Sequence, residues 1–224
     1  MRAVAAEIAA LVRAHPQAVL GLASGDTPMG VYRELARLHR EEALDFSGVH
    51  TFNLDEYSGI AVDDPRSFHS AMRTHLFDIV GLPPSRTHFP DEWATGDEFE
   101  QAIHSAGGID YQLLGVGRNG HIGFNEPGSP MTSRTRHVAL TEVTREDAAR
   151  IFGGVDRVPT HAVTMGVATI REARRVRVLA FGPGKAGVVL RTRSAPVDPQ
   201  WPASLLHGHP DVQLIVDQAA VDRP

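Results

Sequence analysis

Short, mostly apolar runs are spaced along this chain, and they constrain its fold more than any other feature. They cover residues 18–23, 49–54, 109–116, 176–181 and 212–217. Runs of this length, without a regular polar face, are typical of strands that are buried on both sides. Such strands occur in parallel sheets whose two faces are covered by helices.

The segments between these runs carry helical patterns, near residues 28–39, 67–80, 97–105, 144–152, 167–172 and 185–191. Strands that alternate with helices indicate an α/β fold. We therefore predict a single domain over residues 1–224. Its centre is a doubly wound, mostly parallel, Rossmann-like sheet with helices on both faces.

Residues 1–16 resemble a signal peptide at first sight, but Glu7 interrupts their apolar run and Arg13 closes it. The spacing of alanine and leucine suits an amphipathic helix better. No apolar stretch approaches the roughly 20 residues of a membrane helix. We therefore expect no membrane association.

The net charge is −5 and no basic tract is present, which argues against nucleic acid as a partner. The chain has no cysteine, so it has no disulfides, no thiolate metal site and no cysteine nucleophile. This composition fits the cytoplasm. The histidines lack metal-ligand spacing, and we predict no catalytic metal.

Ligands of doubly wound sheets bind beyond the carboxyl ends of the strands, so the loops after the strands are the first candidates for a site. The first is Ser24-Gly25-Asp26-Thr27, followed by Pro28. Thr27 suits a helix N-cap and Pro28 the first helical turn, which together predict an anion site at a helix N-terminus. A tight turn without a ligand is the alternative. A carboxylate here repels phosphate unless it points outward, and we expect Asp26 to point outward.

The second loop places Asp55 and Glu56 next to each other directly after a strand. One of them could act as a general base at the mouth of the sheet. Because neighbouring side chains of an extended chain point in opposite directions, at most one should face a cleft. A solvated loop without function is the alternative, and these residues alone favour it.

The third loop, residues 115–127, holds four glycines within nine residues, which indicates a backbone that approaches another group closely. His121 titrates near neutral pH, and Asn119 and Glu126 could orient its ring or share its proton. A histidine paired with a carboxylate is suited to moving protons on oxygen. The alternative is a histidine that only satisfies loop carbonyls.

Cations for a phosphate group are scattered through the second half of the chain. Lys185 lies in a Gly-Pro-Gly-Lys turn whose spacing is not that of a Walker loop, and Arg150 ends a helical pattern. Arg134 and Arg136 stand close together in a third segment. Each of these cations alone is more often a solvated surface charge.

Taken together, these segments resemble the glucosamine-6-phosphate deaminase family over nearly the whole chain. The matching stretches are LGLASGDTPMGVY, TFNLDEY, LLGVGRNGHIGFNEPGS, SRTR, VPTHAVTMGVATI, FGPGK and LLHGHPDVQLIVD. The pair NLDEY and GRNGHIGFNEP is the most specific part. Related 6-phosphogluconolactonases share the fold and a glycine-histidine loop, but they usually lack FNEP and NLDEY.

The resemblance implies a role for each of these residues. Asp55 would move a proton between carbons 2 and 1 of the sugar. His121 would open the sugar ring, with support from Asn119 and Glu126. The substrate would be a small sugar phosphate, glucosamine 6-phosphate, which water converts into fructose 6-phosphate and ammonia. The resemblance implies no metal and no organic cofactor.

The phosphate group, by the same resemblance, would lie on the backbone of residues 24–27 beside Arg150 and Lys185. Asp26 departs from the family, which usually has an uncharged residue there. Val138 stands where allosteric relatives carry a lysine, so we do not expect activation by an acetylated sugar phosphate. Residues 129–158 are a candidate lid, and a homo-oligomer is possible.

Three other functions remain open from the sequence. The same chemistry could act on galactosamine 6-phosphate or another sugar phosphate. A lactonase would use His121 without Asp55. A non-catalytic sugar-phosphate-binding protein would need the phosphate site but neither of these two side chains.

Overall fold

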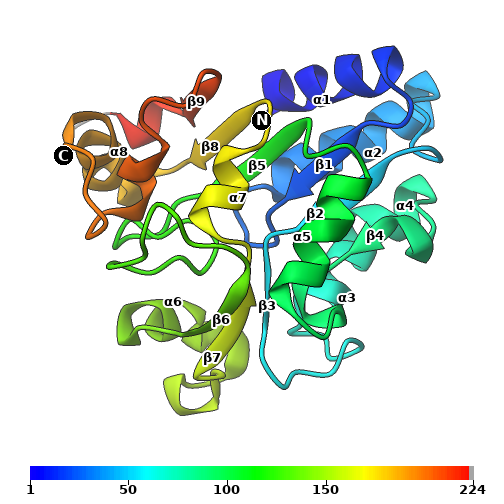
Figure 1. Ribbon diagram of the computed structural model, residues 1–224. Helices are drawn as coiled ribbons and strands as arrows, with labels where there is room; N and C mark the ends of the chain where they lie inside the picture. The colour runs from blue at the N-terminus through cyan, green and yellow to red at the C-terminus, as the bar shows by residue number, and fades with distance from the viewer. Residues whose placement is uncertain (222–224) are drawn as a thin grey trace.

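A six-stranded parallel sheet forms the centre of the computed structural model, which describes residues 1–221 (Figure 1). Its strand order is β4-β2-β1-β5-β8-β9. The strands are β1 (Val19–Leu22), β2 (His50–Asn53), β4 (Thr87–His88), β5 (Tyr111–Gly115), β8 (Val176–Ala180) and β9 (Val212–Val216). The chain runs outward from β1 to β4, returns to the other side of β1, and continues to β9. The order therefore reverses between β1 and β5, where doubly wound sheets bind their ligands.

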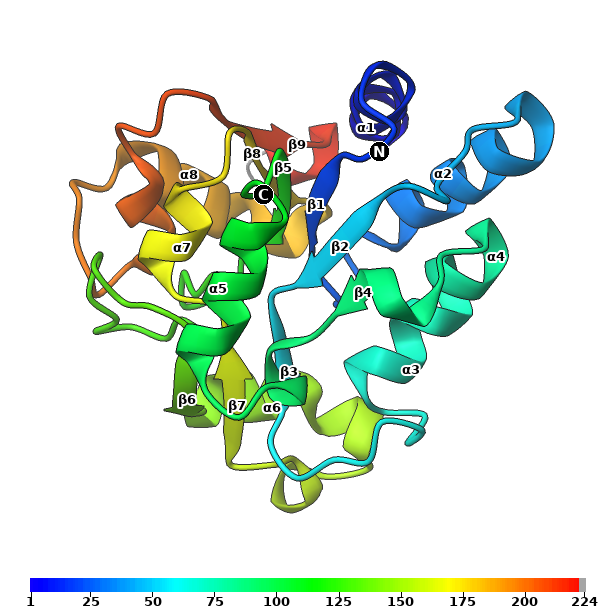
Figure 2. The ribbon, with the colours of Figure 1, turned by 45° about the vertical axis from the view of Figure 1, so that its right-hand side comes forward.

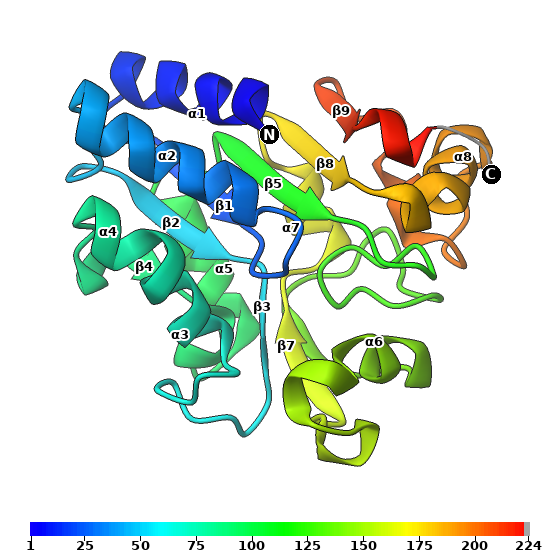
Figure 3. The ribbon, with the colours of Figure 1, turned by 180° about the vertical axis from the view of Figure 1, so that it is seen from behind.

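Helices cover both faces of this sheet, as the sequence predicts. Figure 3 shows α1 (Arg2–Ala14) and α2 (Met29–Glu42) in front of one face. Figure 1 shows α5 (Gly96–Ser105) and α7 (Val167–Arg171) in front of the other. The core on this second face also includes residues of α8 (Ala186–Ser194). These positions confirm the fold class.

The predicted helix at residues 67–80 is one helical run with a wider turn in its middle. It consists of α3 (Phe68–Met72), a π-helical turn (Arg73–Phe77) and α4 (Asp78–Val80). Short 3₁₀ turns lie at Pro84–Arg86, Pro90–Glu92, Val155–Arg157, Pro183–Lys185, Pro202–Leu206 and Gln218–Ala220. Within residues 1–221 no helix is long and apolar enough to cross a membrane.

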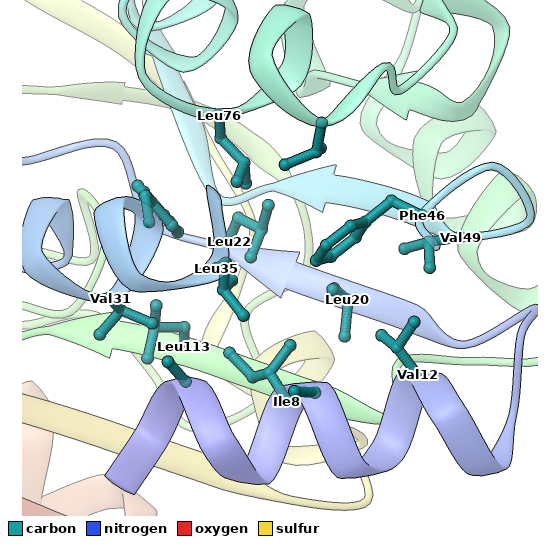
Figure 4. Packing of buried hydrophobic residues seen from close by; sticks show 14 of the residues in the cluster. Ile8, Val12, Leu20, Leu22, Val31, Leu35, Phe46, Val49, Leu76 and Leu113 are labelled. Atoms are coloured by element: carbon teal, nitrogen blue, oxygen red, sulfur yellow. The ribbon is translucent and has the colours of Figure 1, made fainter. Parts of the chain in front are cut away.

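Strand alternation divides the core between the two faces of the sheet. In β1, Leu20 and Leu22 pack with Ile8 of α1 and Leu35 of α2 (Figure 4), whereas Val19 belongs to the cluster on the other face. Side chains of successive strand residues point to opposite faces, so both faces of an apolar strand are buried. The amphipathic helix expected at the N-terminus is confirmed, with its apolar side on this core.

A second, antiparallel sheet of three strands was not predicted. It comprises β3 (Asp55–Tyr57), β7 (His161–Thr164) and β6 (Arg136–Ala139), in that order. Figures 1 and 2 show it below the large sheet, next to α6 (Glu142–Phe152). The candidate lid, residues 129–158, includes β6 and α6.

Leu54 is the only residue between β2 of the large sheet and β3 of the small one. Its N–H donates to the carbonyl of Leu22 at 3.0 Å, and its carbonyl accepts from the N–H of Met165 at 2.6 Å. The side chain is 1 % exposed. The backbone of this buried residue is thus hydrogen-bonded to β1 of the large sheet and to Met165, the residue that follows β7 of the small sheet.

Candidate active site

A cleft of about 470 Å³ opens beyond the carboxyl ends of β1, β2 and β5, at the point where the strand order reverses. Its volume lies in the range of small-molecule sites. The lining includes residues from the three loops that follow strands and from the Gly-Pro-Gly-Lys turn, but not Arg134 or Arg136: it holds Ser24, Gly25, Asp26, Thr27, Asp55, His121 and Lys185. A hollow of similar size beside α5 includes Glu100 and Arg134, but these two already form a salt bridge at 2.7 Å.

Asp55, the first residue of β3, is 6 % exposed and lines this cleft. Its carboxyl group accepts no hydrogen bond from any residue in the range 1–221. Burial, reinforced by the neighbouring charge of Glu56, raises the pKa of Asp55 to about 8. A carboxyl group in this state has a high proton affinity and is free to meet a ligand, which suits a general base.

Glu56 points away from the cleft, which confirms that only one of the two carboxylates faces it. Its oxygens accept the N–H groups of Tyr57 at 2.8 Å and His69 at 3.0 Å. The solvated loop considered as an alternative is excluded, because both side chains are buried.

His121 lines the same cleft as Asp55. Its Nδ1 lies 3.2 Å from Oγ1 of Thr144 and 3.8 Å from a carboxylate oxygen of Glu126. Burial is the largest influence on the ring and lowers its pKa, and Glu126 opposes this shift. The ring is therefore neutral near pH 7 and can both accept and donate a proton.

A chain of polar groups joins His121 to Glu126. Thr144 Oγ1 lies 3.3 Å from Thr141 Oγ1, and Thr141 donates to Glu126 at 3.2 Å. Asn119 donates to the same carboxylate at 3.0 Å, and its own oxygen accepts the N–H of His121 at 3.1 Å. The structure thus brings Asn119, His121 and Glu126 together as predicted. The two threonines were missed, although the Thr-x-x-Thr spacing at the start of a helix is an N-cap signal.

The glycines of this loop make room for the reacting side chains. A Cβ on Gly117 would lie 2.2 Å from Cε1 of His121, and one on Gly123 would lie 3.2 Å from a carboxylate oxygen of Asp55. Gly123 also has a φ of +55°, a conformation that favours glycine. The predicted close approach of this backbone is confirmed, and the groups it approaches are His121 and Asp55.

The first loop differs in one detail from the sequence prediction. The N-cap of α2 is Pro28 rather than Thr27, and no side chain caps this helix. In the part of the chain that the structure describes, the N–H groups of Gly25, Asp26 and Thr27 have no acceptor. Three free amides on the cleft wall suit an anion better than a closed turn would.

Lys185 reaches the cleft from the turn after β8. Its Nζ donates to the carbonyl of Val116 at 2.7 Å, and burial lowers its pKa. Asp147 of α6 also lines the cleft and partly opposes this shift, a contact that the sequence did not indicate. The carbonyl holds the ammonium group in place while two of its protons stay available for a ligand.

Arg150 lies at the rim rather than in the cleft lining. Its guanidinium group is 3.6 Å from the carboxylate of Asp26, and the two side chains are 85 % and 86 % exposed. Asp26 thus points toward solvent and Arg150, and its relation to a bound phosphate stays a prediction. An ion pair this exposed contributes little stability.

Comparisons with known proteins agree with this site. The family profile described as glucosamine-6-phosphate isomerases/6-phosphogluconolactonase matches residues 1–215. Glucosamine-6-phosphate deaminase of Bacillus velezensis is 46 % identical over 218 residues, which cover 95 % of this chain and 90 % of that protein. Glucosamine-6-phosphate deaminase 1 of Bacillus subtilis is 45 % identical, with 97 % and 92 % covered.

Solved structures give the same result. A monomeric glucosamine-6-phosphate deaminase superimposes with a TM-score of 0.94 at 43 % identity, covering 98 % of this chain and 93 % of the other. The 6-phosphogluconolactonase of Thermotoga maritima shares the fold, with a TM-score of 0.72 at 22 % identity over 95 % of this chain and 91 % of the other. On the strength of the profile, the relatives and the structure, this chain belongs to the glucosamine-6-phosphate deaminase family.

Proposed function

We propose that this protein converts glucosamine 6-phosphate and water into fructose 6-phosphate and ammonia. The observation that carries the proposal is Asp55, a buried carboxyl group without a protein hydrogen bond that shares the cleft with His121. An isomerase needs such a base beside carbon 2 of the sugar. A lactonase or a simple binding protein does not.

His121 acts first, on the closed sugar ring. Its neutral ring takes the proton of the hydroxyl group on carbon 1 and returns a proton to the ring oxygen as the carbon–oxygen bond breaks. Glu126, 3.8 Å from Nδ1, stabilises the imidazolium form while the proton is on the ring. The product of this step is the open-chain aldehyde.

Asp55 then moves the proton that defines the isomerisation. Its carboxylate removes the proton from carbon 2, the electron pair forms a double bond to carbon 1, and the aldehyde oxygen takes up a proton from His121, which gives an enolamine. Asp55 returns its proton to carbon 1 and leaves a protonated imine at carbon 2. Water adds to this imine, nitrogen leaves as ammonia and one proton goes back to His121, so the ketone oxygen of fructose 6-phosphate comes from water.

The phosphate group binds at the opposite end of the cleft in this proposal. The free amides of Gly25, Asp26 and Thr27 and the ammonium group of Lys185 supply donors there. Arg150 approaches from the rim, where its guanidinium group lies 3.6 Å from the carboxylate of Asp26. Together these donors hold an anion although the chain as a whole is acidic.

The test is release of ammonia from glucosamine 6-phosphate and, in parallel, from galactosamine 6-phosphate. We expect release from the first, and a loss of about 10²–10⁴-fold in kcat for Asp55→Asn, which keeps the side-chain shape but removes the base. Asp63→Asn removes an exposed carboxylate in the loop after β3 and is the matched control, with activity retained.

The other functions are separate outcomes of the same assay. If ammonia were released only from galactosamine 6-phosphate, the reaction would be as proposed but the substrate would be the other epimer. If the protein hydrolysed 6-phosphogluconolactone and the Asp55→Asn variant kept this activity, the protein would be a lactonase instead. Binding of sugar phosphates by folded protein without turnover would replace it by a binding role.

Two broader expectations accompany this function. Consumption of water makes the enzyme a hydrolase as well as an isomerase in its chemistry. A cytoplasmic location fits a phosphorylated substrate, and self-association stays a prediction from the sequence.

A further inference from the structure

Glu56 is a buried carboxylate that the reaction itself does not use. It is 0 % exposed and lies on the side of β3 opposite to Asp55. One oxygen accepts the N–H of Tyr57 in β3, and the other accepts the N–H of His69 in α3. It therefore ties the strand that carries Asp55 to the helix behind it.

A second pair of charges stands behind Glu56. His69 Nε2 lies 3.0 Å from a carboxylate oxygen of Asp91, and its Nδ1 lies 3.8 Å from Glu92. The imidazole stacks on Phe89 with the ring centres 3.7 Å apart. Burial lowers the pKa of His69, but the carboxylates of Asp91 and Glu92 outweigh this and raise it. A protonated His69 supplies positive charge that favours an ionised Glu56, and the charge of Asp91 opposes this in part.

The two neighbouring carboxyl groups influence each other. Burial raises the pKa of Glu56 to about 7 and that of Asp55 to about 8, and the charge of Glu56 contributes to the second value. Ionised Glu56 thus makes it harder for Asp55 to lose its proton. The same repulsion makes Asp55 a stronger base once it has lost it.

We propose that Glu56, backed by His69 and Asp91, is a positioning residue for Asp55. Its hydrogen bonds fix β3 so that Asp55 points into the cleft, and its negative charge keeps Asp55 strongly basic. This inference rests on the proposed function, because it assigns Glu56 a part in the same proton transfer.

The remaining groups around this pair do not supply the same effect. Thr164 and Val163 of β7, which stand opposite Asp55 and Glu56, are uncharged. The guanidinium group of Arg136 in β6 is bonded to Asn125 at 3.0 Å. The other titratable groups nearby are Tyr32 of α2, Tyr57 of β3, Glu92 of the 3₁₀ turn, and His121 and Lys185 of the cleft lining.

A strong base matters for this reaction because the proton to be removed is on carbon. In general base catalysis the rate increases with the proton affinity of the base, as long as the base is ionised at the working pH. Glu56 therefore increases the rate above the pKa of Asp55. In exchange it narrows the pH range in which Asp55 is ionised.

The direct test follows the Asp55 carboxyl carbon by ¹³C NMR during a pH titration, with Asp55→Asn used to assign the signal. We expect a midpoint near pH 8 in the unchanged protein. Glu56→Gln should lower it by about one pH unit, the size expected for two carboxylates on opposite sides of a strand at an effective dielectric near 20.

A second variant keeps the test decisive if Glu56→Gln does not fold. His69→Phe preserves the stacked ring on Phe89 and removes the cation that favours ionised Glu56. It should therefore also lower the Asp55 midpoint. Glu100→Gln is the matched control, because Glu100 is likewise a carboxylate that accepts a backbone N–H, from Thr135 at 2.6 Å, but it belongs to α5 and does not line the cleft with Asp55. It should leave the midpoint unchanged.

The activity assay gives an independent measurement of the same effect. In Glu56→Gln the acid limb of kcat/KM should move down by about one pH unit, and the rate on the alkaline plateau should fall several-fold, with KM retained. A role in folding alone would lower the rate without moving this limb.

An Asp55 midpoint that stays near pH 8 in a folded variant, Glu56→Gln or His69→Phe, would overturn the inference. The NMR titration needs no substrate. If the unchanged protein released no ammonia from any amino-sugar phosphate, the proposed function would fail, while the titration would still decide whether Glu56 controls Asp55.

Discussion

Replacing Asp55 by asparagine should make the folded protein more stable at alkaline pH, even though it removes the base. The folded carboxyl group titrates near pH 8 because it is buried without a hydrogen-bond partner. A carboxyl group in the unfolded chain loses its proton near pH 3.9. Because the pKa is higher in the folded state, ionisation of Asp55 favours unfolding. The resulting loss of stability is absent below the pKa of the unfolded chain and grows as the pH rises toward the folded pKa.

The size of this effect follows from the two pKa values. Between them the folded protein holds a proton that the unfolded chain has released, and the free energy of unfolding falls by about 1.4 kcal/mol per pH unit. From pH 5 to pH 8 the fall attributable to Asp55 is about 3–4 kcal/mol. An asparagine side chain does not titrate, so the Asp55→Asn variant should gain this amount relative to the unchanged protein over the same range.

Urea denaturation at pH 5 and pH 8 gives the change in unfolding free energy between the two pH values, for the unchanged protein and for Asp55→Asn. Comparing these two changes cancels any pH-independent cost of burying the amide. Asp63→Asn removes an exposed carboxylate and controls for the substitution. If the unfolding free energies of Asp55→Asn and the unchanged protein had the same pH dependence, the burial and high pKa assigned to Asp55 would be wrong.

Three further predictions concern other parts of the molecule. Gly117→Ala places a Cβ 2.2 Å from the His121 ring, so the ring must move. This displacement should lower kcat/KM by about 10²-fold in the ammonia assay. An unchanged kcat/KM would show that the position of the ring is not critical. Lys185→Met removes a charged donor to the phosphate group and should raise KM about 10–100-fold with little effect on kcat. Inorganic phosphate should also inhibit the variant less than the unchanged protein. Equal inhibition of the variant and the unchanged protein would contradict this role of Lys185. Arg177, 4 % exposed, is bonded to Glu7 at 2.9 Å and to Asp211 at 2.8 Å at the amino end of the sheet. Arg177→Met should therefore cost about 2 kcal/mol of stability in urea denaturation and leave kcat unchanged. A loss of activity without a loss of stability would refute this purely structural assignment.

The large sheet could be predicted from the sequence because each of its main strands is a short apolar run that needs burial on both faces. The small sheet could not. Strands such as Asp55–Tyr57 and His161–Thr164 have three or four residues, and their polar side chains give no apolar pattern. They pair with segments far away in the sequence, so their strand structure depends on tertiary contacts rather than on local propensity.

The candidate site, like the fold, could be predicted only in part. The position of His121, Asn119 and Glu126 in one glycine-rich loop made their proximity predictable, and the alternation of Asp55 and Glu56 gave the direction of the base. The resemblance placed Arg150 near residues 24–27, but the ion pair of Arg150 with the side chain of Asp26 was not predicted, because the two residues lie far apart in the chain and no local pattern indicates the pairing. The N-cap at Pro28 was missed because propensity favours Thr27, and local backbone geometry prevailed.

The hydrogen-bonded connection at Leu54 has a consequence for substrate choice. The candidate phosphate loop follows β1 in the large sheet, and Asp55 begins the small sheet one residue after β2. Since Leu54 connects the two sheets through its backbone hydrogen bonds, the backbone sets the distance between the phosphate loop and Asp55. Only a sugar phosphate whose carbon chain matches this distance can place its carbon 2 beside the base. An amino-sugar phosphate one carbon shorter should bind through its phosphate yet present the wrong carbon to Asp55, so it should inhibit the enzyme without releasing ammonia.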